Sequence, residues 1–165
     1  MNELLIYSNE LGDSAPKEIQ ILKYGTTTTQ EGDYFTDEES INEVLSFYSR
    51  RKIDLYFDYN HLSLEPKTVE DGVSAGWYKL EKRQDGLWAT DIDWTDRARN
   101  YIESKEFRYY SPVIQVRNDK PVRLVNCALT NLPATDNIIP LTLRENLIKR
   151  QEKEDLDKLF SYIFK

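Results

Sequence analysis

A β-hairpin signal near the middle of the chain limits its fold more than any other feature. The segments 75–82 and 87–94 flank the dipeptide Asp85-Gly86, which tolerates the positive backbone angles of tight hairpin turns. The eleven tyrosines and three tryptophans of the sequence belong to the residue types that favour strands. A hairpin within a β-rich core is therefore expected.

Further strands are expected from short apolar runs and from alternation of apolar and polar residues. They cover residues 4–6, 18–24, 53–60, 107–116 and 122–130. Continuing the alternation of the third of these segments places His61 in phase with the apolar face. Asn118-Asp119 is expected to turn between the last two strands, and residues 26–32 are expected to form an exposed connection.

Helices are indicated by capping residues that precede apolar residues at helical spacing. Thr36 with Glu39 forms a capping box that predicts a helix from about residue 37 to 50, and Thr95 caps a second helix that ends near 105. A similar box at Thr142 leads into a highly charged segment. The sequence thus predicts one domain over residues 1–140 and a charged amphipathic helix over residues 141–165.

Charge and composition exclude several classes of function. A net charge of -7 and an isoelectric point near 4.9 repel nucleic acid and anionic lipid. No apolar run approaches the roughly 20 residues that span a bilayer, and residues 1–10 lack the features of a secretory signal, so a cytoplasmic protein is expected. One cysteine and one histidine cannot build a structural zinc site without several carboxylates. No metal or cofactor is therefore expected.

The single histidine, His61, is the side chain whose pKa naturally lies near neutrality, as a general base requires. Ser111 is a candidate nucleophile because it interrupts an apolar, aromatic strand in phase with Tyr109 and Val113. On spacing alone, a small core serine and a strand-end histidine facing solvent are the better interpretation. The pair becomes specific only through the sequences around each residue.

Five ordered motifs surround this pair. They are Phe57-Asp-Tyr-Asn-His61, Ala75-Gly-Trp77, Gly86-Leu-Trp-Ala89 with Trp94-Thr95, Tyr109-Tyr-Ser-Pro112, and Ala128-Leu-Thr-Asn-Leu-Pro-Ala134. In this order, over residues 53–140, they resemble the Mu-like prophage protease family, and an ordered set is far more specific than one short match. The histidine motif of that family falls on His61 and its serine motif on Ser111.

The resemblance implies a serine endopeptidase of phage capsid maturation, which cuts the internal scaffold, and often itself, during head assembly. Its partners would be phage scaffold and capsid proteins, and it would act in the host cytoplasm, within the assembling prohead. The family is similar to prohead and herpesvirus assemblin proteases, which implies an α+β fold with a small mixed, mostly antiparallel, β-barrel-like sheet, flanking helices and a homodimer. The tail over residues 141–165 would be either the start of a scaffold region or a solvated helix.

The residue that orients His61 is chosen from two candidates. On a regular strand Asp58 would point to the face opposite His61 unless a bulge intervenes. Asn126 is in phase with the apolar face of its strand, so we assign it as the third catalytic residue, with a structural asparagine as the alternative. Related prohead proteases tend to carry an acidic residue near this place. Oxyanion donors are expected from the backbone around Arg108 and Ser111.

Two other classes of function remain open on the sequence alone. A non-enzymatic scaffold or capsid-assembly module with the same fold would have no chemical need for His61 or Ser111, yet both positions are filled. A cysteine hydrolase would pair Cys127 with His61. Cys127 is out of phase with Asn126, which favours a buried structural thiol.

Overall fold

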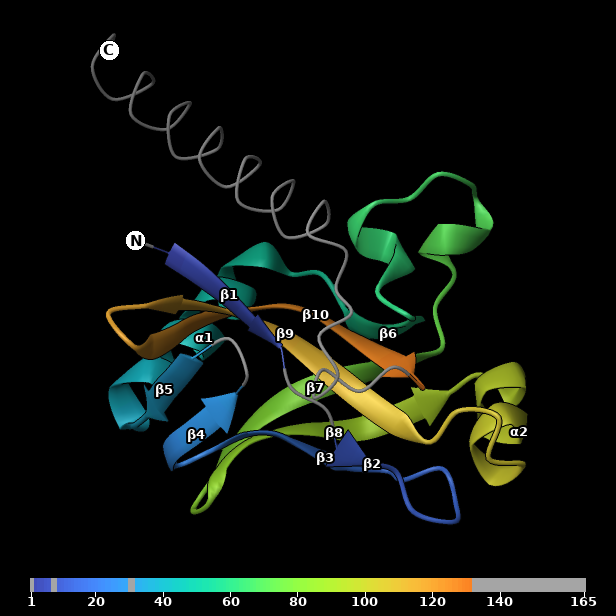
Figure 1. Cartoon of the computed structure of the whole chain (residues 1–165), viewed down its shortest axis with the longest axis horizontal. Helices are drawn as coiled ribbons and strands as arrows, with labels where there is room; N and C mark the ends of the chain where they lie inside the picture. The colour runs from blue at the N-terminus through green and yellow to red at the C-terminus, as the bar shows by residue number, and fades with distance from the viewer. Residues whose placement is uncertain (1, 7–8, 30–31, 132–165) are drawn as a thin grey trace, which may run out of the picture.

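Eight strands form one curved sheet (Figure 1). The computed structural model describes residues 2–6, 9–29 and 32–131. The order of the sheet is β1-β9-β10-β6-β7-β8-β3, and β2 pairs with β9. The strands of this sheet are β1 (Asn2–Ile6), β2 (Asn9–Glu10), β3 (Ile19–Lys23), β6 (Leu55–Tyr59), β7 (Gly76–Arg83), β8 (Gly86–Trp94), β9 (Tyr109–Arg117) and β10 (Lys120–Thr130).

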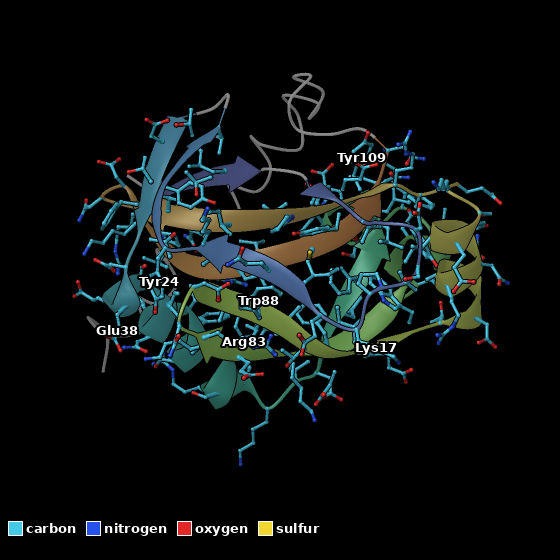
Figure 2. All side chains as sticks on the ribbon, turned by 90° about the horizontal axis from the view of Figure 1, so that it is seen from below. Lys17, Tyr24, Glu38, Arg83, Trp88 and Tyr109 are labelled. Carbon is cyan, nitrogen blue, oxygen red and sulfur yellow. The ribbon has the colours of Figure 1, made fainter. Side chains whose placement is uncertain are left out.

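The sheet is mostly antiparallel and nearly closed. Among the described strands, only β10 and β6 pair in parallel. The Tyr110 hydroxyl of β9 donates to the Gln20 carbonyl of β3 at 3.0 Å, which links strands that are far apart in the sheet order. Figure 2 shows β9 and β10 arching above β7 and β8. The expected α+β fold with a mixed, mostly antiparallel sheet is confirmed.

The β7–β8 hairpin forms at the predicted turn. Gly86 has a φ of 144°, a conformation that residues with a Cβ rarely adopt. A Cβ there would lie 1.9 Å from the Leu22 carbonyl oxygen, because β3 pairs with β8 beside the turn. Arg83, at the end of β7, lies 5.0 Å from the centre of the Trp88 ring and forms an ion pair with Glu18 (Figure 2). The turn therefore also helps to hold β3 against β8.

Two α-helices lie at the ends of the sheet in the described part of the chain (Figure 1). They are α1 (Glu38–Arg51) and α2 (Asp96–Glu103). Asp37, rather than the predicted Thr36, caps α1, because its carboxylate accepts the Ser40 N–H at 2.9 Å and the Ser40 hydroxyl accepts the Asp37 N–H. The predicted cap of α2 by Thr95 is confirmed. Neither helix has the length and apolar character needed to cross a membrane.

The threonine run does not form the expected exposed connection. It belongs to β4 (Gly25–Thr29), which pairs with β5 (Gly32–Thr36) in a separate two-stranded sheet. The Phe35 N–H donates to the Asp119 carbonyl at 2.6 Å, which attaches this small sheet to the confirmed turn between β9 and β10. The predicted helix over residues 141–165 and the boundary at residue 140 lie outside the described residues.

An aromatic cluster around Phe57 gives two of the sequence motifs a structural role. The Phe57 ring lies 4.6 Å from that of Tyr78 and 4.7 Å from that of Trp94. Gly76 pairs with both Phe57 and Trp94 across the sheet. A Cβ on Gly76 would lie 2.8 Å from the Trp94 ring and 3.1 Å from the Asp93 carbonyl oxygen. The glycine is thus required by close packing.

We expect Gly76→Ala to lower the free energy of unfolding by about 1–3 kcal/mol, because the added methyl group overpacks the Phe57 cluster. Gly72→Ala is the matched control, since nothing lies within 4 Å of a Cβ there, and it should change stability by less than about 0.5 kcal/mol. Urea denaturation followed by tryptophan fluorescence measures both. Equal stability of the two variants would contradict this packing role.

Candidate active site

The chain leaves β6 through an unusual turn that carries His61. The Asn60 N–H still donates to the Leu129 carbonyl of β10 at 2.8 Å. Asn60 and His61 then adopt positive φ angles of 52° and 58°, which are uncommon for residues with a side chain. The predicted continuation of the β6 alternation to His61 is therefore wrong, because the strand ends at Tyr59.

The turn brings the imidazole of His61 against β10. The His61 Nδ1 atom lies 2.6 Å from the Asn126 Oδ1 atom in a partly buried site. An amide oxygen can only accept a hydrogen bond, so Nδ1 carries the ring hydrogen and donates it. The Nε2 atom then keeps its lone pair, which is the state that a general base requires. This is the geometry that the orienting role assigned to Asn126 needs, although the catalytic role remains a prediction.

A bulge in β10 directs Asn126 away from the core. The register against β9 shifts between Leu124 and Asn126, which leaves Val125 as an extra residue. Leu124 and Cys127 both belong to the buried core despite their spacing of three residues. Asn126, next to Cys127 on a regular stretch, points to the opposite face. The sequence argument that Asn126 is in phase with the apolar face of its strand is therefore wrong.

Two further side chains extend this contact into a network. The Asn126 Nδ2 group donates to the Ser63 hydroxyl at 3.0 Å. The hydroxyl and backbone N–H of Ser63 both reach the Asp58 Oδ2 atom, at 2.5 Å and 2.8 Å. Asp58 is completely buried. A hydrogen-bonded chain thus runs from Asp58 through Ser63 and Asn126 to His61.

The sequence reasoning missed this network in two ways. It rejected Asp58 because a regular strand would turn that carboxylate away from His61, whereas the turn at Asn60 places both groups on one side of β6. Ser63 belongs to no sequence motif, and it lies in a short 3-10 helix (η1, Leu62–Leu64). The adjacent Asn60 was the available signal, because asparagine tolerates the left-handed conformation and so permits a sharp turn.

Ser111 lies on the face of the sheet that carries the network. In the register, Asp58 of β6 lies beside Ala128 of β10, and Ala128 lies beside Ser111 of β9. Neighbours across strands point to the same face, as do residues two apart, so Asn126 shares this face with Ser111. Their Cα atoms are diagonal neighbours, which typically lie about 7–8 Å apart.

The hydroxyl of Ser111 is not bonded to His61 in this structure. Ser111 is 1% exposed, and among the described residues its Oγ atom has no hydrogen-bond partner. A buried hydroxyl without a partner costs roughly 1–3 kcal/mol of stability, so its retention needs a reason. The structure therefore places the predicted nucleophile and base on one face but leaves them unconnected.

The environment of His61 favours the neutral imidazole. Burial lowers the pKa of His61 below its ordinary value of 6.5, because a charged ring is poorly solvated there. The negative charge of Asp58 and the hydrogen bond with Asn126 act in the opposite direction without cancelling this effect. At neutral pH the ring is thus available to accept a proton.

The alternative nucleophile and the expected oxyanion donor are both poorly placed. Cys127 is fully buried, and burial raises the pKa of its thiol well above the ordinary value. It also points away from the face on which Asn126 holds His61. The Arg108 N–H donates to the Asn131 side chain at 3.0 Å, so it is already engaged. Within the described ranges, no group of histidine, cysteine and acidic side chains could hold a metal ion.

Two hollows border the His61 turn. One of about 230 Å³ reaches Ser63 and Asn126 and is lined largely by aromatic and aliphatic side chains. The other, of about 280 Å³, is bordered by Asn60 and Leu62. Neither of these two hollows is lined by His61 or Ser111.

Fold and site together define an α+β domain in which serine, histidine, asparagine and aspartate side chains lie on one side of a curved sheet. Residues 19–142 match the family described as Mu-like prophage I protein, N-terminal domain. Because this match covers most of the chain, the protein belongs to that family. No curated protein and no solved structure matches the chain significantly. The resemblance to Mu-like prophage proteins is thus confirmed, and a phage-related role follows from it.

The pKa of His61 can be measured without ambiguity, because the chain has no other histidine. We expect proton NMR titration of the folded protein to give a value below 6.5. As the pH falls below 6.5 the unfolded chain takes up this proton first, so the contribution of His61 to stability is complete above 6.5 and is lost toward the folded pKa. His61→Gln should remove this component from the pH dependence of the free energy of unfolding. A folded-state pKa above 6.5 would contradict the described burial.

Proposed function

We propose that this domain is a serine endopeptidase of phage head assembly, with Ser111 as nucleophile, His61 as general base and Asn126 as the residue that orients the imidazole. The observation that carries the proposal is the hydrogen bond from His61 Nδ1 to Asn126, on the sheet face that also bears the unpartnered hydroxyl of Ser111. This bond leaves Nε2 free to accept the serine proton. Membership of the Mu-like prophage family agrees with a role in phage particles.

The mechanism follows from the roles of these atoms. His61 Nε2 takes the proton of Ser111 as the hydroxyl oxygen attacks the scissile carbonyl, and it returns that proton to the leaving amine. Water then hydrolyses the acyl-enzyme with His61 again acting as base. Asn126 keeps the ring oriented throughout. The hollow beside Ser63 and Asn126 offers space for a substrate side chain.

The substrates that suit this proposal are the internal scaffold of the phage head and the protease chain itself. The partners would then be scaffold and capsid proteins, and cleavage would take place in the host cytoplasm within the assembling prohead. The nearly closed, mostly antiparallel sheet supports a further proposal, that the domain shares the fold of prohead and assemblin proteases. A homodimer belongs to this proposal as well.

The burial of Ser111 bears on when the site would work. A peptide carbonyl cannot reach a hydroxyl that is 1% exposed and not bonded to its base. This observation fits an enzyme that stays inactive until assembly rearranges the face around Ser111. It also favours the alternative function, a non-enzymatic scaffold or capsid-assembly module that retains the fold.

We expect the protein, mixed with its own scaffold protein under assembly conditions, to yield discrete fragments that mass spectrometry can identify. Ser111→Ala and His61→Ala should each reduce this cleavage by at least about a thousandfold, since nucleophile and base act as one unit. Ser46→Ala, at an exposed serine of α1, is the matched control and should retain full activity.

Unchanged cleavage by Ser111→Ala would exclude the serine mechanism. A serine-directed phosphonate should label Ser111, whereas alkylation of thiols should leave the rate unchanged because Cys127 faces the core. If assembly proceeds normally with Ser111→Ala and no fragments form with the wild type, the non-enzymatic module is the better explanation.

A further inference from the structure

We propose that Asp58 and Ser63 are positioning residues that fix the tautomer of His61 through the amide of Asn126. The inference depends on the proposed function only for the use of the free Nε2 atom as a base. The tautomer itself is a property of the folded protein and can be measured without any cleavage assay.

The direction of the network is set at Asp58. Its Oδ2 atom accepts the backbone N–H of Ser63 at 2.8 Å, and a backbone N–H can only donate. The same oxygen lies 2.5 Å from the Ser63 hydroxyl, and because a carboxylate can only accept, this hydroxyl donates its hydrogen to Asp58. Complete burial of Asp58 deprives this oxygen of competing water.

Because the Ser63 hydroxyl donates its hydrogen to Asp58, it fixes the orientation of the Asn126 amide. With its hydrogen given to Asp58, the Ser63 oxygen has only lone pairs to offer to Asn126. The amide must then present its Nδ2 group, which lies 3.0 Å from that oxygen. A flipped amide would place two acceptors against each other in a partly buried site, an arrangement that proteins avoid.

The orientation of the amide in turn selects the state of the imidazole. Once Nδ2 faces Ser63, the Oδ1 atom faces His61, and the 2.6 Å contact requires a hydrogen on Nδ1. The carboxylate of Asp58 thus acts on His61 through two neutral side chains, those of Ser63 and Asn126, rather than by direct contact. Related prohead proteases tend to carry an acidic residue beside the histidine. Here Asp58 takes that role through these two intervening side chains.

Nitrogen NMR of protein labelled at the His61 ring tests the proposal, because protonated and unprotonated ring nitrogens have well-separated chemical shifts. In the wild type above the pKa of His61, we expect the Nδ1–H tautomer to exceed the other by about tenfold, since the flipped network loses a hydrogen bond. Ser63→Ala should reduce this ratio several-fold, because the amide is then free to rotate. Asp58→Asn should have the same effect. Asp93→Asn removes one exposed acidic group outside the network and should leave the ratio unchanged.

The wild-type measurement alone can overturn the proposal, so the test does not depend on the folding of any variant. A predominant Nε2–H tautomer in the wild type, or an unchanged ratio in folded Ser63→Ala, would refute it. If cleavage is found, Ser63→Ala should lower kcat several-fold with little change in KM, and a loss of binding alone would count against the proposal. A tautomer shift in a protein that cleaves nothing supports this inference and counts only against the protease assignment.

Discussion

The parallel pairing of β10 with β6 is the constraint on which the site depends. It joins residues about seventy positions apart, placing Phe57 beside Cys127 and Asp58 beside Ala128. Because β9 pairs with the other edge of β10, the same strand also sets the position of Ser111. The turn after β6 then places His61 against the side chain of Asn126. Without this pairing, neither Asn126 nor Ser111 would come near the turn that carries His61.

The sequence predicted the positions of the helices, strands and turns better than it predicted which way the side chains of the strands point. The β7–β8 hairpin, the turn at Asn118-Asp119 and the cap at Thr95 follow from local chemistry, and each occurs where expected. The threonine strand β4 was missed because its partner β5 supplies the pairing and its own residues carry no apolar pattern. The predicted side-chain directions are wrong at two places, where a turn at Asn60 and an extra residue at Val125 break the alternation of the strand.

The candidate site was accessible from the sequence only in part. Local motifs indicated His61 and Ser111. Asn126, which does contact His61, was chosen on an argument of strand phase that the bulge at Val125 makes wrong. The carboxylate at Asp58 was set aside by an argument that holds only for a straight strand. Ser63 joins the network through a backbone turn rather than through any sequence pattern, so spacing could not have found it. The burial of Ser111 is a tertiary property that no local sequence encodes.

The register of β10 against β9 shifts twice, and the second shift, at Val125, reverses the alternation between Leu124 and Cys127. Before Val125 the strand faces the interior through Leu124, and after it through Cys127. An alignment of relatives that follows hydrophobic alternation would therefore slip by one residue at this point. Such a misalignment would place the thiol of Cys127, instead of the amide of Asn126, opposite the imidazole of His61. A site that uses a serine hydroxyl would then be mistaken for one that uses a cysteine thiol.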